Sequence, residues 1–517
     1  MSEIIHSSLK KTVKGSSFVF MGTAISMVIW FVLKILIIRN TTKAELGLYS
    51  LAVAIAGLFS IFANAGINSG ATRFVSIFLG EGRKEDARLV AVSAMSISTV
   101  MGLAGSALLF LSSGLMAGWI FYMPEIEMPF KAVAAFVFFQ VTSRVIVSVL
   151  NGYSILKPNV YYVSIGQPLA SLVLIGACLY MKLPFISIIY AYSLAIAVSW
   201  VALGVSSYRY LGIFPFSLKR GGHARTLIEF SLPIVIGSAS AMIMNWMDSI
   251  ILGRYMGAEA VGAYSICTTL TQLLTFAYTS AAFVYMPIAG DMYSKGQSAE
   301  LKKTYQVLTK WVFSLTLPLF LVMFMFPEMT ISFLFNKNYP DIIAPTRLLA
   351  LGLMFNVFMG TNSLLLIVMG KSKVLMHIAT LGTVLNLFLN YLFIKQLGWG
   401  LNGAALATMI AYVLPNIVVS VILHRQSGIH PFTLSYIRPL VGISLVSLVV
   451  YAVAKLLPMS LWMLPIYFAI FIAGYTASLF LTRSIEAEDL FMLDTISKRV
   501  GIEMTGIKSL VRRFVKT

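Results

Sequence analysis

The segment RNTTKAELGLYS, residues 39–50, decides the fold, because it returns later in the chain as RYMGAEAVGAYS, residues 254–265. Each copy stands between two long apolar runs and carries an arginine, then a glycine, a tyrosine and a serine at the same spacing. We therefore interpret it as one helix-to-helix connection that occurs in both halves of the chain. The residues matched at an offset of 215 are Arg39 and Arg254, Gly47 and Gly262, Tyr49 and Tyr264, and Ser50 and Ser265.

The offset holds, with slow drift, well beyond this segment. Gly22 matches Gly237 at 215, and Gly82 matches Gly296 at 214. The matches keep their order along the chain, which favours two homologous units of six helices each. The predicted domains are an N-terminal lobe at 1–215, a C-terminal lobe at 216–430, two additional helices at 431–483 and a tail at 484–517.

The composition indicates an all-α membrane protein. The 517 residues are 59% hydrophobic and 11% charged, whereas a soluble domain carries roughly 25% charged residues. An apolar run of about 20 residues spans a bilayer as a helix. The loops leave no room for a soluble catalytic domain. We predict fourteen transmembrane helices, at 16–38, 48–78, 88–117, 128–151, 158–180, 185–208, 227–253, 260–289, 308–334, 345–369, 373–394, 401–423, 435–456 and 461–482.

The first run has no clear cleavage site after it, so we expect a retained helix and not a signal peptide. Both cysteines, Cys178 and Cys267, fall inside predicted spans. They form neither a disulfide framework nor a metal-ligand spacing. No metal and no cofactor are expected.

The net charge of +19 could suggest that the protein binds nucleic acid. The distribution of the basic residues indicates instead that they set the orientation of the helices in the membrane. Of the 38 lysines and arginines, 25 fall on the side of the N-terminus, seven on the other side and six within spans. This is the positive-inside pattern. We therefore expect a multi-pass protein of the cytoplasmic membrane with both termini cytoplasmic. The tail is predicted to be either an amphipathic helix on the inner leaflet or a solvated segment.

Six spans in each lobe make a parallel repeat, and transporters of this kind hold substrate between lobes that rock. In this arrangement 39–50 and 254–265 are outer connections. Gly47 and Gly262 are expected to allow a tight turn there. Tyr49 and Tyr264 are expected in the aromatic belt at the membrane interface.

Polar residues inside spans need a reason, because each is costly in lipid. Gln140, Arg144, Ser148 and Asn151 form one stripe of a helix, and the matching span carries Asn356 and Asn362. Two interpretations stay open for this stripe. It either makes interhelical hydrogen bonds or faces a wet cavity.

Lys34 and the pair Asn245 and Asp248 lie on the first helices of the two lobes. Lys34 and Asp248 have nearly equivalent positions, so they could form an ion pair, or Lys34 could reach the outer surface. The functional alternative places them on the walls of a cleft. Arg73 is a further candidate for the cleft. Lys131 and Arg347 lie near the outer ends of their predicted helices, where the side chains can reach the surface, and Lys310 could be an anchor near the inner end of its helix. Together the six embedded bases favour an anionic ligand.

The stretch VLNLFLNYLFIKQLGWGLNGAALAT, residues 384–408, resembles a pattern of the polysaccharide-transport flippases. These belong to the multidrug/oligosaccharidyl-lipid/polysaccharide (MOP) exporter superfamily. Residues 47–83 resemble the second helix of the same family, although the usual Leu-Gly-Pro is replaced by residues 40–43. We take the motif as a family marker and not as a binding site. The matching residues are Asn386, Asn390, Gly398, Gly400, Gly403, Ala404, Ala405, Ala407 and Thr408.

The resemblance implies a flippase that moves a polyprenyl- or dolichyl-diphosphate-linked oligosaccharide to the outer leaflet. Its partners would be that lipid-linked oligosaccharide, membrane lipids, and glycan polymerases or glycosyltransferases, with no nucleic acid. The tail is similar to that of archaeal members, which favours dolichyl phosphate as carrier. The sequence leaves open whether an H⁺ gradient, a Na⁺ gradient or the membrane potential drives transport.

Three alternatives remain. A multidrug exporter of the same superfamily would need acids in its cleft, and the embedded charge has the opposite sign. A lipid II-type flippase would show a paired charge motif in its first span, which is not evident. A membrane glycosyltransferase or acyltransferase is the enzymatic alternative. The five histidines are not grouped in the sequence as catalytic residues of such an enzyme would be.

Overall fold

The computed structural model describes residues 2–213, 223–456, 462–482, 484 and 489. Within these, side chains are described except for 2–18, 232–242 and 284. The chain divides into two compact units, one of Met1–Ser265 with Ile394–Gly400 and one of Ile266–Phe393 with Leu401–Thr517. We call them unit 1 and unit 2. The lobes at 1–215 and 216–430 rest on the sequence repeat and stay a prediction.

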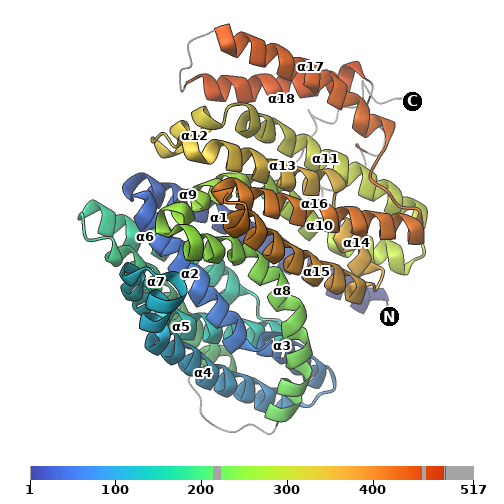
Figure 1. The fold of residues 1–517 in the computed structure, drawn as a ribbon. Coiled ribbons are helices and arrows are strands. Elements are labelled where there is room, and N and C mark those ends of the chain that lie inside the picture. Colours follow the sequence, from blue (N-terminus) through green and yellow to red (C-terminus); the bar gives the residue numbers. More distant parts are fainter. Residues whose placement is uncertain (1, 214–222, 457–461, 483, 485–488, 490–517) are drawn as a thin grey trace. The chain divides into compact units, whose positions relative to one another are not determined.

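The regular secondary structure in the described residues of unit 1 is all helical (Figure 1). Its helix α5 lies at the centre, packed against α2, α3, α4 and α7. The helices that lie wholly or largely in this unit are α1 (Ser2–Asn40), α2 (Lys43–Asn64), α3 (Ile67–Gly80), α4 (Lys84–Leu115), α5 (Glu127–Gly152), α6 (Gln167–Tyr180), α7 (Ile186–Leu211), α8 (Ala224–Met256) and α9 (Ala258–Thr271), with short helices η1 (Met116–Phe121), η2 (Pro124–Ile126) and η3 (Asn159–Gly166). The short helix η6 (Tyr391–Gln396) begins in unit 2 and ends in unit 1.

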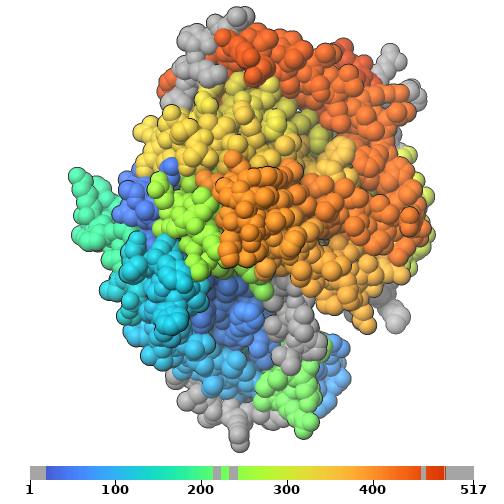
Figure 2. All heavy atoms as spheres, viewed as in Figure 1, coloured from blue at the N-terminus to red at the C-terminus, as the bar shows by residue number. Residues whose placement is uncertain are grey.

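Unit 2 is also helical in its described part, and its helix α11 packs against α10, α13 and α18. α17 and α18 pack along each other, and their red-orange surface is seen in Figure 2. Leu445 and Ile470 are exposed there, as expected for helices that face lipid. The helices are η4 (Gln272–Leu274), α10 (Thr275–Ser294), α11 (Ser298–Met325), α12 (Pro327–Phe335), η5 (Pro340–Ile342), α13 (Ile343–Met359), α14 (Asn362–Val368), α15 (Ser372–Asn390), α16 (Gly400–Ser427), α17 (Leu434–Leu456) and α18 (Met463–Leu481).

Thirteen helices of the described residues are long and apolar enough to cross a membrane. The protein is therefore an all-helical, multi-pass membrane protein. The remaining predicted span, 227–253, coincides with α8, and its residues 232–242 lie outside the described side chains. The long predicted span 48–78 is broken into α2 and α3 at Ala65 and Gly66, which both have positive φ.

The repeated connection differs from its prediction in two ways. Gly47 and Gly262 do not form turns: they lie inside α2 and α9 and are absent from the positive-φ residues. The chain turns earlier, where the Thr42 side chain caps α2 in a capping box with Glu45. The belt prediction is also wrong, because Tyr49 is 3% exposed and Tyr264 is 2% exposed. The connection is thus a packed part of unit 1.

Candidate functional site

A cluster of aromatic rings lies inside unit 1, and Tyr192 of α7 is its hub. The Tyr192 ring centroid lies 5.9 Å from that of Trp30, 5.8 Å from that of Tyr49 and 5.6 Å from that of Phe136. These rings come from α1, α2 and α5. We call these four residues the aromatic cluster. Four separate helices meet there, so the cluster exists only in the folded unit.

Two embedded bases lie on helices that supply rings to the aromatic cluster. The Lys34 Nζ lies 5.0 Å from the ring centroid of Tyr49, which is a cation–π contact. Arg144 lies on the face of α5 that supplies Phe136 to the cluster. Helical spacing explains both placements, because Trp30 and Lys34 share one face of α1, and Phe136 and Arg144 share one face of α5 with Gln140. Gln140, Arg144 and Lys34 are all half-buried.

No carboxylate neutralises these bases within the part of the chain that the structure describes. Lys34 and Arg144 form no ion pair there, and neither does Arg73. A charge held inside a helix bundle without a partner is costly. Two such charges around one group of rings can bind an anion that arrives from outside the chain.

Asp248 lies against the other repeated tyrosine. The Tyr264 hydroxyl donates a hydrogen bond of 2.6 Å to Asp248 Oδ2, and Asp248 is 5% exposed. Lys34 contacts Tyr49, and Asp248 contacts the equivalent Tyr264, so the two charges occupy related positions. They form no ion pair with each other in this structure. Asn245, three residues before Asp248 on α8, is exposed and has a further contact.

The remaining candidates lie apart from the aromatic cluster. Arg73 is exposed on α3 and stacks over the Phe230 ring at 4.5 Å. In unit 2, Asn356 is half-buried on α13. Asn362 is fully buried at the start of α14, and its amide donates to Ser420 Oγ at 2.8 Å and to Asn416 Oδ1 at 3.3 Å. Its contacts are those of an interhelical hydrogen-bond network.

The other embedded bases have partners. Lys131 Nζ lies 2.6 Å from Glu127 Oε1 on the same helix, and Arg347 Nε donates to the Phe324 carbonyl at 2.9 Å. Among the described residues no group of three His, Cys, Asp or Glu side chains could hold a metal ion.

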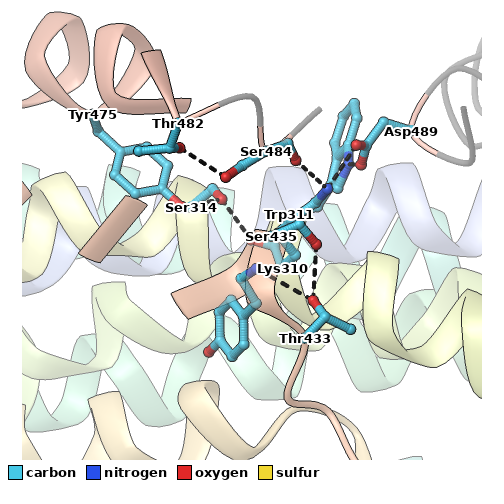
Figure 3. A network of polar contacts seen from close by, with 10 residues as sticks. Lys310, Trp311, Ser314, Thr433, Ser435, Tyr475, Thr482, Ser484 and Asp489 are labelled. Atoms are coloured by element: carbon cyan, nitrogen blue, oxygen red, sulfur yellow. Dashed lines mark hydrogen bonds and ion pairs between the residues drawn. The ribbon is translucent and has the colours of Figure 1, made fainter. Parts of the chain in front are cut away.

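Lys310 has the most complete set of partners (Figure 3). Its Nζ lies 2.6 Å from Asp489 Oδ2 and donates to the Ser484 carbonyl at 3.1 Å. Trp311 Nε1 donates to the second carboxylate oxygen, Asp489 Oδ1, at 2.7 Å. The Lys310 and Asp489 side chains are 6% and 5% exposed. The Tyr475 hydroxyl and the Ser314 hydroxyl are 2.8 Å apart nearby. Lys310 thus anchors Asp489, beyond α18, to α11.

Reasoning from sequence missed the roles of Tyr192, Tyr49 and Trp30. Tyr192 lies in an Ala-Tyr pair that recurs as Ala411 and Tyr412, and this repeat was the available signal. It could not show that Tyr192 contacts Tyr49 and Trp30, because those residues come from other helices.

Comparisons with known proteins agree with this architecture. The family model described as "Polysaccharide biosynthesis protein" matches residues 12–293, and the model described as "MatE" matches residues 233–392. An uncharacterized membrane protein of Methanocaldococcus jannaschii is 23% identical over 436 residues, which cover 78% of this chain and 82% of that protein. A probable low-salt glycan biosynthesis flippase of Haloferax volcanii is 23% identical over 210 residues, which cover 39% and 43%.

Two solved structures share the fold. The lipid II flippase MurJ in an inward closed conformation has a TM-score of 0.70 at 17% identity, covering 92% of this chain and 99% of that one. An inward-facing MATE family multidrug resistance transporter has a TM-score of 0.65 at 16% identity, covering 79% and 94%. The chain therefore belongs to the polysaccharide biosynthesis protein family of the MOP superfamily, whose members are membrane transporters and not enzymes.

Proposed function

We propose that this transporter is a flippase for a polyprenyl- or dolichyl-diphosphate-linked oligosaccharide. The observation that carries the proposal is the pair of unneutralised bases, Lys34 and Arg144, on two of the helices that supply rings to the aromatic cluster. A relative named as a probable glycan biosynthesis flippase supports the class of substrate.

Each part of the site suits one part of such a substrate. The diphosphate is the most costly part to carry through hydrocarbon, and cations offset that cost. An arginine can grip phosphate oxygens in a bidentate manner, whereas a lysine supplies a point charge. Trp30 is the half-buried member of the aromatic cluster, and an aromatic face of this kind offers an apolar surface for sugar rings. The polyprenyl tail needs no shelter, because it stays in lipid.

The mechanism proposed here is alternating access without covalent chemistry. Two six-helix lobes, 1–215 and 216–430, would rock about the substrate, with helices 431–483 outside the repeat. We propose fourteen crossings, both termini cytoplasmic and residues 118–127 outside. Gln140, Asn245, Asp248 and Asn356, with Arg73, remain candidates for contact with the glycan or head group, whereas the contacts of the buried Asn362 assign it to the interhelical network. Glycan polymerases or glycosyltransferases would act before or after transport.

The alternative is a multidrug exporter, which the likeness to a MATE transporter favours. Organic cations would need an available acid, and the buried Asp248 is the candidate, although it accepts a hydrogen bond from Tyr264. Lys34 and Arg144 disfavour this alternative, because both carry charge of the same sign as such drugs.

The test is a flipping assay in proteoliposomes with a lipid-diphosphate oligosaccharide. We expect Arg144→Ala and Lys34→Ala each to slow flipping, and the double variant to abolish it. Lys131→Ala is the matched control, because this embedded base already has a carboxylate partner. Flipping at the unaltered rate in the double variant would refute the proposed site. Export of an organic cation that depends on Asp248 would favour the alternative.

A further inference from the structure

Three connections that lie far apart in the sequence pack together at one end of unit 1. A Cβ on Gly257, directly after α8, would lie 3.9 Å from the sulfur of Met123, in the connection between η1 and η2. A Cβ on Gly400 would lie 2.9 Å from the terminal methyl group of Met256, the last residue of α8. The end of α8 therefore contacts both the connection that precedes α5 and the segment 394–400.

Arg254 lies in the last turn of α8, and its guanidinium is held against two tyrosine rings. Its Cζ lies 4.3 Å from the ring centroid of Tyr122 and 5.3 Å from that of Tyr255. A ring attracts a cation but carries no net charge, so these contacts position the guanidinium without neutralising it. Arg254 forms no ion pair with the carboxylates that the structure describes, and Glu259 lies 3.9 Å from Lys43 instead.

Lys395 brings a second positive charge to the same ring. Its Nζ lies 5.4 Å from the centroid of Tyr255, so Arg254 and Lys395 both lie within 5.4 Å of the centre of one ring. Like charges so close together repel each other, and an anion that binds both of them offsets that repulsion. Arg254 is half-buried and Lys395 is exposed, so a ligand can reach both from the surface.

The surroundings of these two bases are those of a membrane interface. Aromatic side chains are exposed on two of the three connections: Trp119 is 79% exposed, Tyr122 64% and Trp399 48%. Such rings gather at the level of the lipid head groups. The distribution of basic residues along the sequence predicts that Arg254 and Lys395 lie on the outer side. The anions present at this level are the phosphates of lipids.

We propose that Arg254 and Lys395, held by the rings of Tyr122 and Tyr255, bind the phosphate of an anionic lipid head group. Arginine can hold two phosphate oxygens at once, and lysine adds a point charge. The site shares no residue with the aromatic cluster or with the bases of the proposed flippase site. A lipid bound here to the folded protein alone stabilises the packed connections, because ligand binding shifts the unfolding equilibrium.

The first test titrates the detergent-purified protein with dihexanoylphosphatidylglycerol, a short-chain anionic lipid, and follows thermal unfolding. The lipid should raise the Tm, and Arg254→Gln/Lys395→Gln should raise its apparent Kd by roughly tenfold or more, since two charged contacts are lost. Lys455→Gln is the matched control, because Lys455 lies 4.8 Å from the ring centroid of Tyr451 as a single cation. Its Kd should equal that of the unaltered protein. Equal Kd values for the unaltered protein and the double variant would overturn the proposal.

Two further ligands distinguish the sources of phosphate in the same assay. Inorganic phosphate should leave the Tm unchanged, because it lacks the acyl chains that place a lipid at the interface. Dihexanoylphosphatidylcholine should bind more weakly than the phosphatidylglycerol, because its head group carries a compensating positive charge. An equal shift with inorganic phosphate would overturn the assignment to lipid.

The second test asks whether the ring of Tyr255 positions the two bases. Tyr255→Leu should weaken binding of the phosphatidylglycerol, whereas Tyr255→Phe should preserve it, because a cation–π contact needs only the ring. Unweakened binding by Tyr255→Leu, or an equal loss in both variants, would overturn the role of the ring. Neither test uses a flipping substrate, so failure of the flippase proposal would leave both results unaffected.

Discussion

Two lysines embedded in helices, Lys34 of unit 1 and Lys310 of unit 2, have opposite surroundings. Lys310 contacts the carboxylate of Asp489 and the backbone carbonyl of Ser484. The neighbouring Trp311 donates a hydrogen bond to the other carboxylate oxygen of Asp489. Lys34 lies over the ring of Tyr49 and has no carboxylate partner among the described residues.

This difference separates structural bases from bases available to a ligand. A buried pair in which both ions are satisfied has no capacity for another anion, and removing one partner leaves the other charge stranded. An unpaired base lowers stability in the empty protein and gains a partner only when an anion binds. Lys131 also has a carboxylate partner, although its pair with Glu127 is partly exposed, and Arg144 falls in the second class with Lys34.

The largest effect is expected where the satisfied pair is broken. Asp489→Asn or Lys310→Met should each lower the free energy of unfolding by about 3–5 kcal/mol, because a buried charge loses its partner. The double variant Lys310→Met/Asp489→Leu should recover most of that loss. Thermal unfolding in detergent measures all three. A double variant as unstable as the sum of the single ones would show that the two residues do not act as a pair.

The unpaired bases should show the reverse behaviour. Arg144→Met and Lys34→Met should leave thermal stability unchanged or slightly higher, while flipping falls by the equivalent of about 1.5–3 kcal/mol for each lost charged contact. Arg144→Lys should recover only part of the activity. The comparison breaks down if Lys34→Met is as unstable as Lys310→Met, since Lys34 would then have a structural partner.

Asn362 sharpens the comparison for polar residues. Asn362→Ala should lower the free energy of unfolding by about 1–3 kcal/mol, because it leaves the groups of Asn416 and Ser420 without their partner. Flipping per folded molecule should hardly change. Asn356→Ala is the control for stability alone, because Asn356 is only half-buried on the preceding helix α13. A loss of flipping at unchanged stability would move Asn362 to the ligand-binding class.

The smallest effect concerns pH and His430, which lies between α16 and α17. Partial burial, together with Lys302 and His424, lowers the pKa of His430. The unfolded chain then binds a proton more readily than the folded one, so stability is complete above the unfolded pKa of about 6.5 and falls as pH drops toward the folded value. His430→Gln should flatten this slope in thermal unfolding between pH 7 and 5. If the pH dependence of stability is unchanged in this variant, it comes from titratable groups other than His430.

The sequence by itself determined the class of protein, most of its membrane-crossing helices and its family. These depend on local properties: apolar runs of the length of a bilayer, and a marker such as 384–408 that is read along one stretch. It also located Lys34, Arg144 and Lys310 as embedded bases, because an isolated charge stands out in an apolar run.

Only the tertiary structure decided what these residues contact. Lys310 and Asp489 are 179 positions apart, and no periodicity relates a base to a partner so distant. The hub position of Tyr192 depends likewise on rings from three other helices. Gly47 shows the same limit: sequence reasoning assigned it to a turn, whereas it lies in a helix whose backbone meets α9. Glycine is compatible with both roles, and only the neighbouring backbone distinguishes between them.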